Sequence, residues 1–416
     1  MITSGDTLTE TRRKGDLLFL TQRIPYPPIK GEKIRPLQIL KHFAQTYNVH
    51  LGCLIDDPRD WEHVETVNSM CSSAYFGGLN RRWDNLSHMG ALATGQALSV
   101  ALYHHRGLQK WTTHLLDTIR PDVVFVCSSN MAPYVLDHPR SSKSLIVDLA
   151  DVDSEKWSAY ASKATGFMKW VYTREARMVF DLENRIAHEA DFSTFVSEPE
   201  AQMFRKLVPD RTRAIVGVPS GVEYQYFDPS IEFAPPYDGD RPTFVFTGTM
   251  DYIPNVDAVV WFVQDILPII RQTLPDSQFY IVGSSPSPSV QNLARIDGVH
   301  VTGRVPDVRP YLAYARASVA PMRIARGIQN KVMEAMAMAK PVIVTPDALE
   351  GIDAVPGEEL ILANDAASFA AAACRLATDA HERTRIGTAA RLRVERDFSW
   401  NGRLRGFDRL LNRNIN

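Results

Sequence analysis

The sequence predicts an α/β protein made of two doubly wound domains, each with a parallel sheet covered by helices on both faces. Three observations support this class. The chain has 416 residues, more than one hydrophobic core usually serves. Short apolar runs rich in β-branched residues alternate with amphipathic segments along most of its length. A stretch rich in Pro, Gly and Asp divides these segments into two halves.

Continuous apolar runs are the strand candidates in both halves, and amphipathic helical patterns such as Val256–Arg271, Val308–Ala315 and Ala366–Thr378 lie between them. In doubly wound sheets ligands bind beyond the carboxyl ends of the strands, so the residues that follow each run are candidates for a site. The runs are Asp16–Leu20, Val49–Ile55, Val123–Cys127, Leu145–Leu149 and Phe192–Val196, then Thr243–Thr247, Gln278–Val282, Val299–Val301, Ser318–Ala320 and Pro341–Val344.

Domain boundaries follow from the same patterns. Phe227-Asp228-Pro229 and Ala234-Pro235-Pro236 break any apolar period and mark a linker. The last segment is weakly amphipathic, and we expect a helix there that either crosses back to the N-terminal domain or ends the C-terminal one. The predicted parts are a disordered tail over 1–15, an N-terminal Rossmann-like domain over 16–220, a linker over 221–240, a C-terminal Rossmann-like domain over 241–398 and the C-terminal helix over 399–416.

Charge is balanced in both halves. Residues 1–230 hold 26 Lys and Arg against 27 Asp and Glu, and residues 231–416 hold 20 against 21, which argues against a nucleic-acid partner.

No run of 18 apolar residues occurs, and residues 1–15 lack the apolar core of a signal peptide, so we expect a cytoplasmic protein. The four cysteines lie far apart in the sequence and suit buried thiols rather than disulfides or a metal site.

The stretch Gly327–Val344 is the most informative one, and it predicts a glycine turn, a short helix and a buried strand. If the helix begins near Gln329, its first N–H groups lack intrahelical partners and, with the helix dipole, can hold a diphosphate. Lys331 and Glu334 are three residues apart and share one helical face. An ammonium there suits phosphates, and a carboxylate can accept from both hydroxyls of a ribose. The alternative is a solvated surface ion pair, which adds little stability.

Together with the two-domain organisation, this stretch makes the chain resemble the family 4 glycosyltransferases of the GT-B fold over nearly all of residues 16–412. Further segments resemble more narrowly the sugar transferases associated with the PEP-CTERM/XrtA exopolysaccharide system. The resemblance implies two domains facing across a cleft, with a nucleotide-sugar donor held by the C-terminal domain, 241–398, and the acceptor on the side of the N-terminal domain, 16–220. It also implies that the sugar is transferred with retention of anomeric configuration. These further segments are Gln22–Pro28 with Gly31–Arg35, Val147–Trp157, and Thr247–Tyr252.

Only some of the family's donor-site residues have the same residue type at the matching position of this chain. Glu334 matches the second of two glutamates eight positions apart, the one that binds the donor ribose. The first falls on Arg326, whose guanidinium cannot accept hydrogen bonds from sugar hydroxyls and would serve the phosphates instead. After Gly248, where many members carry a phosphate-binding Arg and then a Lys, this chain has Thr249 and a region around Asn255.

Other cations must therefore meet the diphosphate. Breaking the glycosyl–phosphate bond leaves new negative charge on the nucleoside diphosphate, so fixed positive donors at the leaving oxygen are the catalyst needed. We assign that role to Lys331 and Arg323, the alternative for each arginine being a surface salt bridge. The predicted donor-binding residues are Gly248, Thr249, Arg304, Val305, Arg326, Gly327, Ile328, Asn330, Lys331 and Glu334.

A second candidate site follows the first predicted strand. Gly31 lies in a Pro-rich turn, where a glycine lets a sugar or phosphate approach the backbone closely. Lys33 and Arg35 begin the next helix and are predicted to hold an acceptor phosphate or the distal phosphate of the donor. The alternative is that both are solvated basic residues at a helix start.

Carboxylates gather after another predicted strand. Asp151-Val152-Asp153 spells the DxD of metal-dependent transferases, but so short a match is frequent by chance, and GT-B sites use side chains and amides in place of a metal. We therefore expect neither a metal nor another cofactor, the nucleotide sugar, UDP- or GDP-linked, being a substrate. Asp151 is the candidate catalytic group that orients or deprotonates the acceptor hydroxyl, while Asp153 competes as a helix cap.

The segment Lys163–Arg185 mixes basic and aromatic residues on a predicted helix. Such a helix can rest on an anionic membrane surface, which would bring a polyprenyl-diphosphate-linked acceptor within reach and make the protein peripheral at the inner membrane. The alternative is a helix packed within its own domain.

These observations predict a retaining glycosyltransferase of the hexosyltransferase type that serves exopolysaccharide or related surface polysaccharide synthesis, acting on a glycan or a lipid-linked acceptor. A nucleotide-sugar 2-epimerase of the same fold is the nearest rival. A non-catalytic two-lobed ligand-binding protein is a second one. A nicotinamide dehydrogenase is disfavoured, because no dinucleotide fingerprint follows the first strand of either half.

Overall fold

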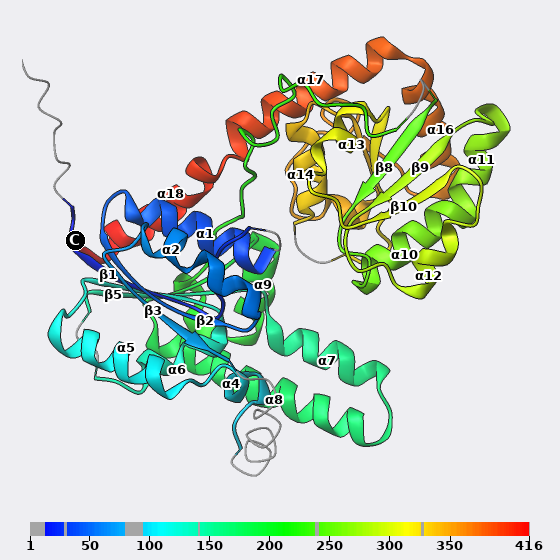
Figure 1. The fold of residues 1–416 in the computed structure, drawn as a ribbon. Helices are drawn as coiled ribbons and strands as arrows, with labels where there is room; N and C mark the ends of the chain where they lie inside the picture. The colour runs from blue at the N-terminus through cyan, green and yellow to red at the C-terminus, as the bar shows by residue number, and fades with distance from the viewer. Residues whose placement is uncertain are drawn as a thin grey trace, which may run out of the picture. The chain divides into compact units, whose positions relative to one another are not determined.

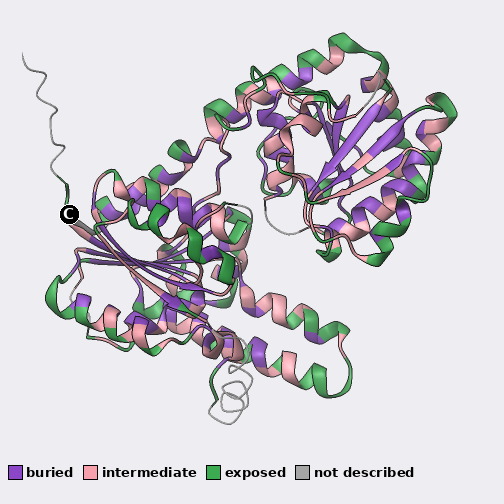
Figure 2. Ribbon diagram, viewed as in Figure 1, coloured by how far each residue is buried: buried purple, intermediate pink, exposed green. Residues whose placement is uncertain are grey.

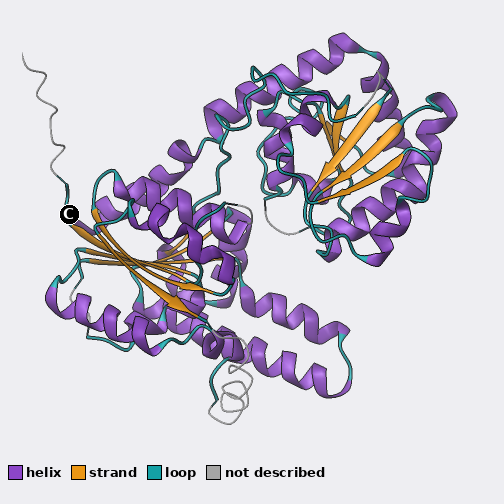
Figure 3. Cartoon of the chain, in the orientation of Figure 1, coloured by secondary structure: helices purple, strands orange, loops and turns teal. Residues whose placement is uncertain are grey.

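The computed structural model describes residues 13–28, 31–79, 95–139, 142–237, 241–325 and 328–415. These residues form two compact units (Figure 1). The first contains the described residues up to Pro219 together with those from Leu404 onward, and the second runs from Ser220 to Arg403. Helices cover both faces of the sheet in each unit (Figure 3).

The first unit begins earlier than predicted. Residues 13–15, placed by the sequence in a disordered tail, are hydrogen-bonded to the start of β2 and the turn before it: the Lys14 amide donates to the Thr46 carbonyl at 2.7 Å, and the Asn48 amide donates to the Gly15 carbonyl at 2.9 Å. The elements of this unit are β1 Asp16–Thr21, α1 Gly31–Ala44, β2 Asn48–Ile55, the 3₁₀ helix η1 Pro58–His63, α2 Val64–Asn68, β3 Ser73–Gly78, α4 Leu98–Leu102, α5 Arg106–Thr118, β4 Val123–Cys127, η2 Ser129–Met131, α6 Pro133–Leu136, β5 Ser144–Ala150, α7 Asp153–Lys163, α8 Gly166–Glu189, β6 Phe192–Phe195, α9 Glu198–Leu207, η3 Pro209–Ala214 and β7 Ile215–Gly217.

Its seven strands pair in parallel in the order β3-β2-β1-β4-β5-β6-β7, so the strand order reverses between β1 and β4. The five strands predicted for this half are confirmed to within one residue at each end. The sequence missed β3 and β7. β3 is an edge strand of Ser, Ala, Gly and aromatic residues with little β-branched character, and β7 is only three residues long.

The core of this unit follows the two-residue period of its strands. Leu18 and Leu20 point to one face of the sheet, and Phe19 between them points to the other. There Phe19 stacks on Phe125 at 5.5 Å between ring centroids, and Phe125 meets Phe43 of α1 at 5.2 Å and Phe407 at 5.0 Å. Phe407 belongs to α18 (Trp400–Ile415), so the later part of that helix is a core element of the first unit.

The second unit has a six-stranded parallel sheet in the order β10-β9-β8-β11-β12-β13, which reverses between β8 and β11. All five strands predicted here are confirmed, and only the two-residue β13 was missed. The strands are the most buried part of the unit (Figure 2). The elements are β8 Thr243–Thr247, α10 Ile253–Trp261, the π-helical turn η4 Phe262–Ile266, α11 Leu267–Thr273, β9 Gln278–Val282, α12 Pro288–Leu293, β10 Val299–Gly303, α13 Arg309–Tyr314, β11 Ala317–Ala320, α14 Asn330–Ala337, β12 Val342–Val344, α15 Pro346–Leu349, β13 Ile361–Leu362, α16 Ala366–Thr378 and α17 Ala380–Asp397.

One helical run, Ile253–Thr273, is long and apolar enough to cross a membrane by length and composition. However, 56% of its most apolar window is buried within the protein. Phe262, Ile266 and Ile270 of this run are fully buried in the core of the second unit, where Phe262 packs against Phe279 of β9 at 4.2 Å between ring centroids. The run is therefore a core helix of this unit.

The predicted linker packs with the second unit. Its Val222 amide donates to the Phe398 carbonyl at 2.8 Å, and Phe227 is buried. Arg391 of α17 fixes the segment further, because its guanidinium donates to the carbonyls of Tyr224 and Phe227, both at 2.8 Å. These contacts hold the start of the segment against α17.

Candidate active site

Three glycines end the first three strands of the second unit's sheet. Gly248, Gly283 and Gly303 follow or close β8, β9 and β10, and the amide of Gly283 donates to the Gly303 carbonyl at 3.2 Å. Gly248 and Gly283 have φ of 157° and 152°, which L side chains rarely adopt. A Cβ on Gly283 would lie 1.7 Å from the Gly248 carbonyl oxygen. The glycines therefore let these strand ends approach closely where the fold places its ligand site.

Lys331 is held above this edge by residues from two elements. It lies in the first turn of α14, which begins at Asn330 with Gln329 as its N-cap residue. Its ammonium donates to Asn255 Oδ1 and to Gln329 Oε1, both at 3.1 Å, and lies 5.1 Å from the Phe246 ring centre. Asn255 in turn donates to the Thr249 carbonyl at 2.9 Å. The ammonium is thereby fixed beside the end of β8.

Glu334 lies one turn further along α14. Both it and Lys331 are half-buried, and burial acts against their charges: it raises the pKa of Glu334 to about 7 and lowers the pKa of Lys331 to about 8. The attraction between the two charges opposes both shifts. Within the described ranges the Glu334 carboxylate has no hydrogen-bond partner. A carboxylate and an ammonium thus lie on one helical face, with hydrogen-bonding capacity left for a ligand.

The other donor-site predictions fall in three groups. Gly248, Thr249 and Asn330 lie with Lys331 at the carboxyl edge of the sheet, and Ile328 lies directly before α14. Arg326 and Gly327 are outside the described residues. Arg304 is exposed and Val305 half-exposed in the turn after β10.

Arg323 is engaged by an acidic residue of the protein itself. Its guanidinium forms two hydrogen bonds with Asp257 of α10, at 2.6 and 3.1 Å, and lies 5.2 Å from the Trp261 ring centre. About half of its side chain is exposed. To meet a phosphate it would have to exchange Asp257 for the ligand.

Tyr226 was not predicted as a site residue, because it lies in the segment assigned to the linker. Burial and then Asp307 raise its pKa, and the charge of Glu334 adds to the increase. Arg309 stacks on the ring at 3.8 Å and donates to the Tyr226 carbonyl at 3.0 Å, while Asp307 accepts three side-chain hydrogen bonds from Arg309. An aromatic residue inside a Pro-rich stretch was the only sequence signal.

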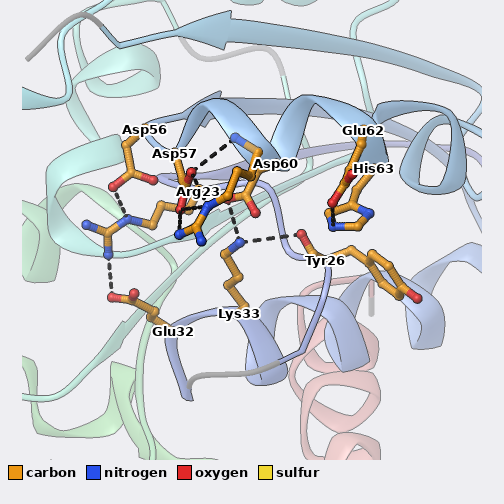
Figure 4. A network of polar contacts seen from close by, with 10 residues as sticks. Arg23, Tyr26, Glu32, Lys33, Asp56, Asp57, Asp60, Glu62 and His63 are labelled. Carbon is orange, nitrogen blue, oxygen red and sulfur yellow. Dashed lines mark hydrogen bonds and ion pairs between the residues drawn. The ribbon is translucent and has the colours of Figure 1, made fainter. Parts of the chain in front are cut away.

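In the first unit, Lys33 is engaged by the protein itself (Figure 4). Its ammonium forms an ion pair with Asp60 of η1 at 2.6 Å and donates to the Tyr26 carbonyl at 3.4 Å. Arg23 bridges Asp56, at 2.9 Å, and Glu32 beside it. Gly31, the first residue of α1, has open space around the position of a Cβ.

Arg35 does not face a ligand, contrary to expectation. It is 5% exposed and donates to both oxygens of the buried Asp148, at 2.7 and 2.8 Å. Thr194 also donates to Asp148, at 2.7 Å. Arg35 is the fifth residue of α1, and its side chain reaches the sheet instead of solvent because this carboxylate lies beneath the helix. The arginine is therefore a buried structural group.

Asp151 and Asp153 share one cation. Lys156 lies 2.8 Å from Asp151 and 3.0 Å from Asp153, and all three side chains are partly exposed. Asp153 is the first residue of α7, and Asp148 is committed to Arg35. Among the described residues, no group of three or more His, Cys, Asp or Glu could hold a metal ion.

Comparison with known proteins supports the class that this fold and site define. Residues 241–379 match the family described as "Glycosyl transferases group 1". No curated protein sequence matches the chain. The matched region contains the three strand-end glycines and α14.

Solved structures share the whole fold at low sequence identity. Sucrose-phosphate synthase from Thermosynechococcus elongatus has a TM-score of 0.67 at 16% identity, covering 97% of this chain and 99% of that one. HepE from Anabaena, solved with UDP-glucose, has a TM-score of 0.65 at 13% identity over 96% and 100%. A UDP-forming α,α-trehalose-phosphate synthase from Burkholderia vietnamiensis has a TM-score of 0.61 at 14% identity over 96% and 100%.

The chain is accordingly a transferase enzyme with the two Rossmann-like domains of the GT-B fold, and its class of reaction is glycosyl transfer. The family match falls on the second unit, where Lys331 and Glu334 lie.

Proposed function

We propose that the second unit binds a UDP- or GDP-linked sugar through α14, and that the protein transfers this sugar with retention of configuration. The observation that carries the proposal is the pair formed by Lys331 and Glu334, half-buried on one face of α14 beside the glycine-lined strand ends. HepE was solved in complex with UDP-glucose, and the trehalose-phosphate synthase is described as UDP-forming. Both descriptions favour UDP over GDP as the nucleotide.

In this proposal the Lys331 ammonium and the backbone N–H groups at the start of α14 bind the diphosphate, and the Glu334 carboxylate accepts hydrogen bonds from the ribose hydroxyls. Breaking the glycosyl–phosphate bond moves negative charge onto the leaving diphosphate, and the fixed ammonium stabilises that charge. The Arg323 guanidinium would contact the diphosphate only after its hydrogen bonds to Asp257 are broken.

For the acceptor we propose a glycan or a polyprenyl-diphosphate-linked sugar of exopolysaccharide synthesis, as the resemblance to the PEP-CTERM/XrtA transferases implies. Asp151 is the candidate group for orienting the acceptor hydroxyl, because it is partly exposed and follows the end of β5. The ion pairs that hold Lys33 and Arg35 make both poor candidates for an acceptor phosphate.

Isothermal titration with UDP and GDP tests the donor site. Lys331→Met and Glu334→Gln should each weaken binding of the preferred nucleotide by about 10-fold or more, because each removes charge-assisted hydrogen bonds worth roughly 1.5–3 kcal/mol. Arg295→Met and Glu358→Gln are matched controls, since both residues are exposed on the same unit away from α14. If all four variants bind as the wild type does, the donor site lies elsewhere.

A membrane contact is part of the proposal, and the α7–α8 hairpin would make it. At its turn Phe167 is 69% exposed and Trp170 53% exposed, and their rings stack at 5.7 Å. Met168 is exposed beside them, and Lys163 and Lys169 add positive charge. Exposed aromatic and basic residues together suit an anionic lipid surface, where a lipid-linked acceptor resides.

Cosedimentation with phosphatidylglycerol vesicles tests this contact. The double variant Phe167→Ser with Trp170→Ser should lose most vesicle binding, because it removes the two largest exposed apolar side chains of the turn. Ile296→Ser, an exposed apolar residue on the second unit, is the control. Equal binding by the double variant and the wild type would rule out the hairpin as the contact.

A further inference from the structure

The side chain of α10 that contacts Lys331 is an amide within the buried face of that helix. Asn255 is the third residue of α10 and is 4% exposed. Ala258, Val259 and Phe262 follow it at helical spacing and are fully buried, so this stripe faces the core of the second unit. A polar side chain in such a stripe destabilises the fold unless its polar atoms have partners. The partners of Asn255 therefore indicate its role.

Both polar atoms of the Asn255 amide have a partner, and the two partners need opposite chemistry. Oδ1 accepts from the Lys331 ammonium at 3.1 Å, and Nδ2 donates to the Thr249 carbonyl at 2.9 Å. An ionised carboxylate cannot donate, and an apolar side chain can neither donate nor accept, so among side chains of this size only an amide serves both partners. Asn255 thereby connects the turn after β8 to α14.

The space around this pair of side chains is closely filled. A Cβ on Gly248 would lie 2.7 Å from Asn255 Nδ2 and 3.5 Å from Lys331 Cε, so the glycine makes room for both. The ammonium also donates to Gln329 Oε1 at 3.1 Å and lies 5.1 Å from the Phe246 ring centre. It is thus held by contacts from β8, from α10 and from the residue before α14.

All the groups that hold Lys331 are uncharged. An ammonium has three N–H donors; amide oxygens accept from two, and the third has no acceptor among the described residues. Glu334 forms no ion pair with Lys331 and acts on it only through its charge. Asp257 of α10 is paired with Arg323, and residues 326–327, outside the described part of the chain, are Arg and Gly. The positive charge is therefore oriented without being paired.

We propose that Asn255 is a positioning residue of the donor site, which aims the third N–H of Lys331 at the diphosphate and leaves the charge of the ammonium available to it. This inference rests on the proposed function, which assigns the diphosphate to Lys331. A carboxylate in the same place would neutralise the ammonium and repel the diphosphate. A fixed ammonium loses less conformational entropy on binding, and it meets the charge of the leaving diphosphate without having to move.

A double-mutant cycle, measured by isothermal titration of the full chain with UDP and with GDP, distinguishes this role from a structural one. Asn255→Ala should weaken binding of the preferred nucleotide about fivefold, the effect of releasing one long side chain. In a Lys331→Met background it should cause no further loss, because Asn255 acts through Lys331. Asn292→Ala, at an exposed position of α12, is the matched control and should bind as the wild type does. Thermal melting confirms that each variant is folded.

Asn255→Asp tests whether the acceptor must be uncharged. Like Asn255→Ala, it loses the hydrogen bond to the Thr249 carbonyl, so comparing the two variants isolates the added charge. We expect Asn255→Asp to bind the nucleotide about 10-fold more weakly than Asn255→Ala. Its loss of binding at alkaline pH should move above pH 8, because the new carboxylate raises the pKa of the neighbouring ammonium. Asn292→Asp, with the same change at an exposed position, should alter neither quantity.

Two results would overturn this inference and leave the proposed function standing. One is an Asn255→Ala variant that binds as the wild type does, or that loses the same affinity in both backgrounds as a structural role requires. The other is an Asn255→Asp variant that binds as tightly as Asn255→Ala with an unchanged pH profile. Normal binding by Lys331→Met alone would instead contradict the donor site itself, and this inference with it.

Discussion

The charges of Lys331 and Glu334 are both disfavoured by their surroundings in the free protein. Burial opposes the charged form of each side chain, and their mutual attraction offsets only part of that effect. A diphosphate would stabilise the ammonium, and ribose hydroxyls would stabilise the carboxylate. Binding of a nucleoside diphosphate therefore stabilises the charged forms of Lys331 and Glu334, which burial destabilises in the free protein.

A pH dependence follows from these shifts. The pKa of Glu334 is raised to about 7, so its carboxylate is ionised only above that pH. The pKa of Lys331 is lowered to about 8, so its ammonium is charged only below that pH. Affinity for a nucleotide sugar, whose diphosphate stays fully ionised, should peak between pH 7 and 8 and fall on both sides. Calorimetric titration across this range measures it.

Two variants show which residue causes the loss of affinity on each side of the pH optimum. Glu334→Gln should flatten the acid limb, because its amide does not titrate. Lys331→Arg should extend binding above pH 8, since an arginine stays charged there. A profile that is the same in both variants and the wild type would show that other groups set the pH dependence.

At the scale of residues, the sequence predicted the relative position of two side chains where that position depends only on their spacing along one helix. The spacing of Lys331 and Glu334 fixes their shared helical face, whatever the rest of the fold does. The role of Asn255 as the group that holds Lys331 was not predictable, because 76 residues separate the two. The same limit applies to Arg35, whose position in the sequence suggested a solvated helix start. Its carboxylate partner, Asp148, lies 113 residues away.

At the scale of elements, the strand-end glycines give a test of how tightly the donor edge is packed. Gly283→Ala places a methyl group 1.7 Å from the Gly248 carbonyl oxygen, at a φ of 152°. We expect it to destabilise the second unit by about 1–3 kcal/mol and to weaken nucleotide binding, because the ends of β8 and β9 must separate. Urea unfolding and calorimetry measure the two effects.

Gly357→Ala is the matched control for that variant. Gly357 also has a positive φ, 83°, but nothing lies within 4 Å of the position of a Cβ. Its cost should be limited to backbone strain of about 1 kcal/mol, with no change in nucleotide binding. Equal losses in the two variants would mean that strain alone, and not the close approach to Gly248, explains the effect.

Element prediction succeeded for buried parallel strands, because a continuous apolar run has one favourable environment in such a fold. It was weaker for the segment Lys163–Arg185, predicted as one helix. α7 ends at Lys163, and α8 begins at Gly166, whose positive φ of 58° allows the turn between them. The pattern of basic and aromatic residues did not reveal this turn.

At the scale of the whole molecule, the sequence predicted two doubly wound domains, and the structure has two parallel sheets whose strand order reverses once in each. Local patterns suffice for this, since alternating strands and helices permit few other arrangements. The packing of Phe407 on Phe43 and Phe125 was not predictable, because a weakly amphipathic terminal helix has no local feature that selects its partner.

The central claim is that Lys331 and Glu334 bind one nucleoside diphosphate, and a crystal structure of the protein with UDP or GDP tests it most directly. We predict that the diphosphate lies on the Lys331 ammonium and the first amides of α14, with a ribose hydroxyl within hydrogen-bonding distance of the Glu334 carboxylate. A nucleotide bound elsewhere, with Lys331 still held only by Asn255 and Gln329, would contradict the claim.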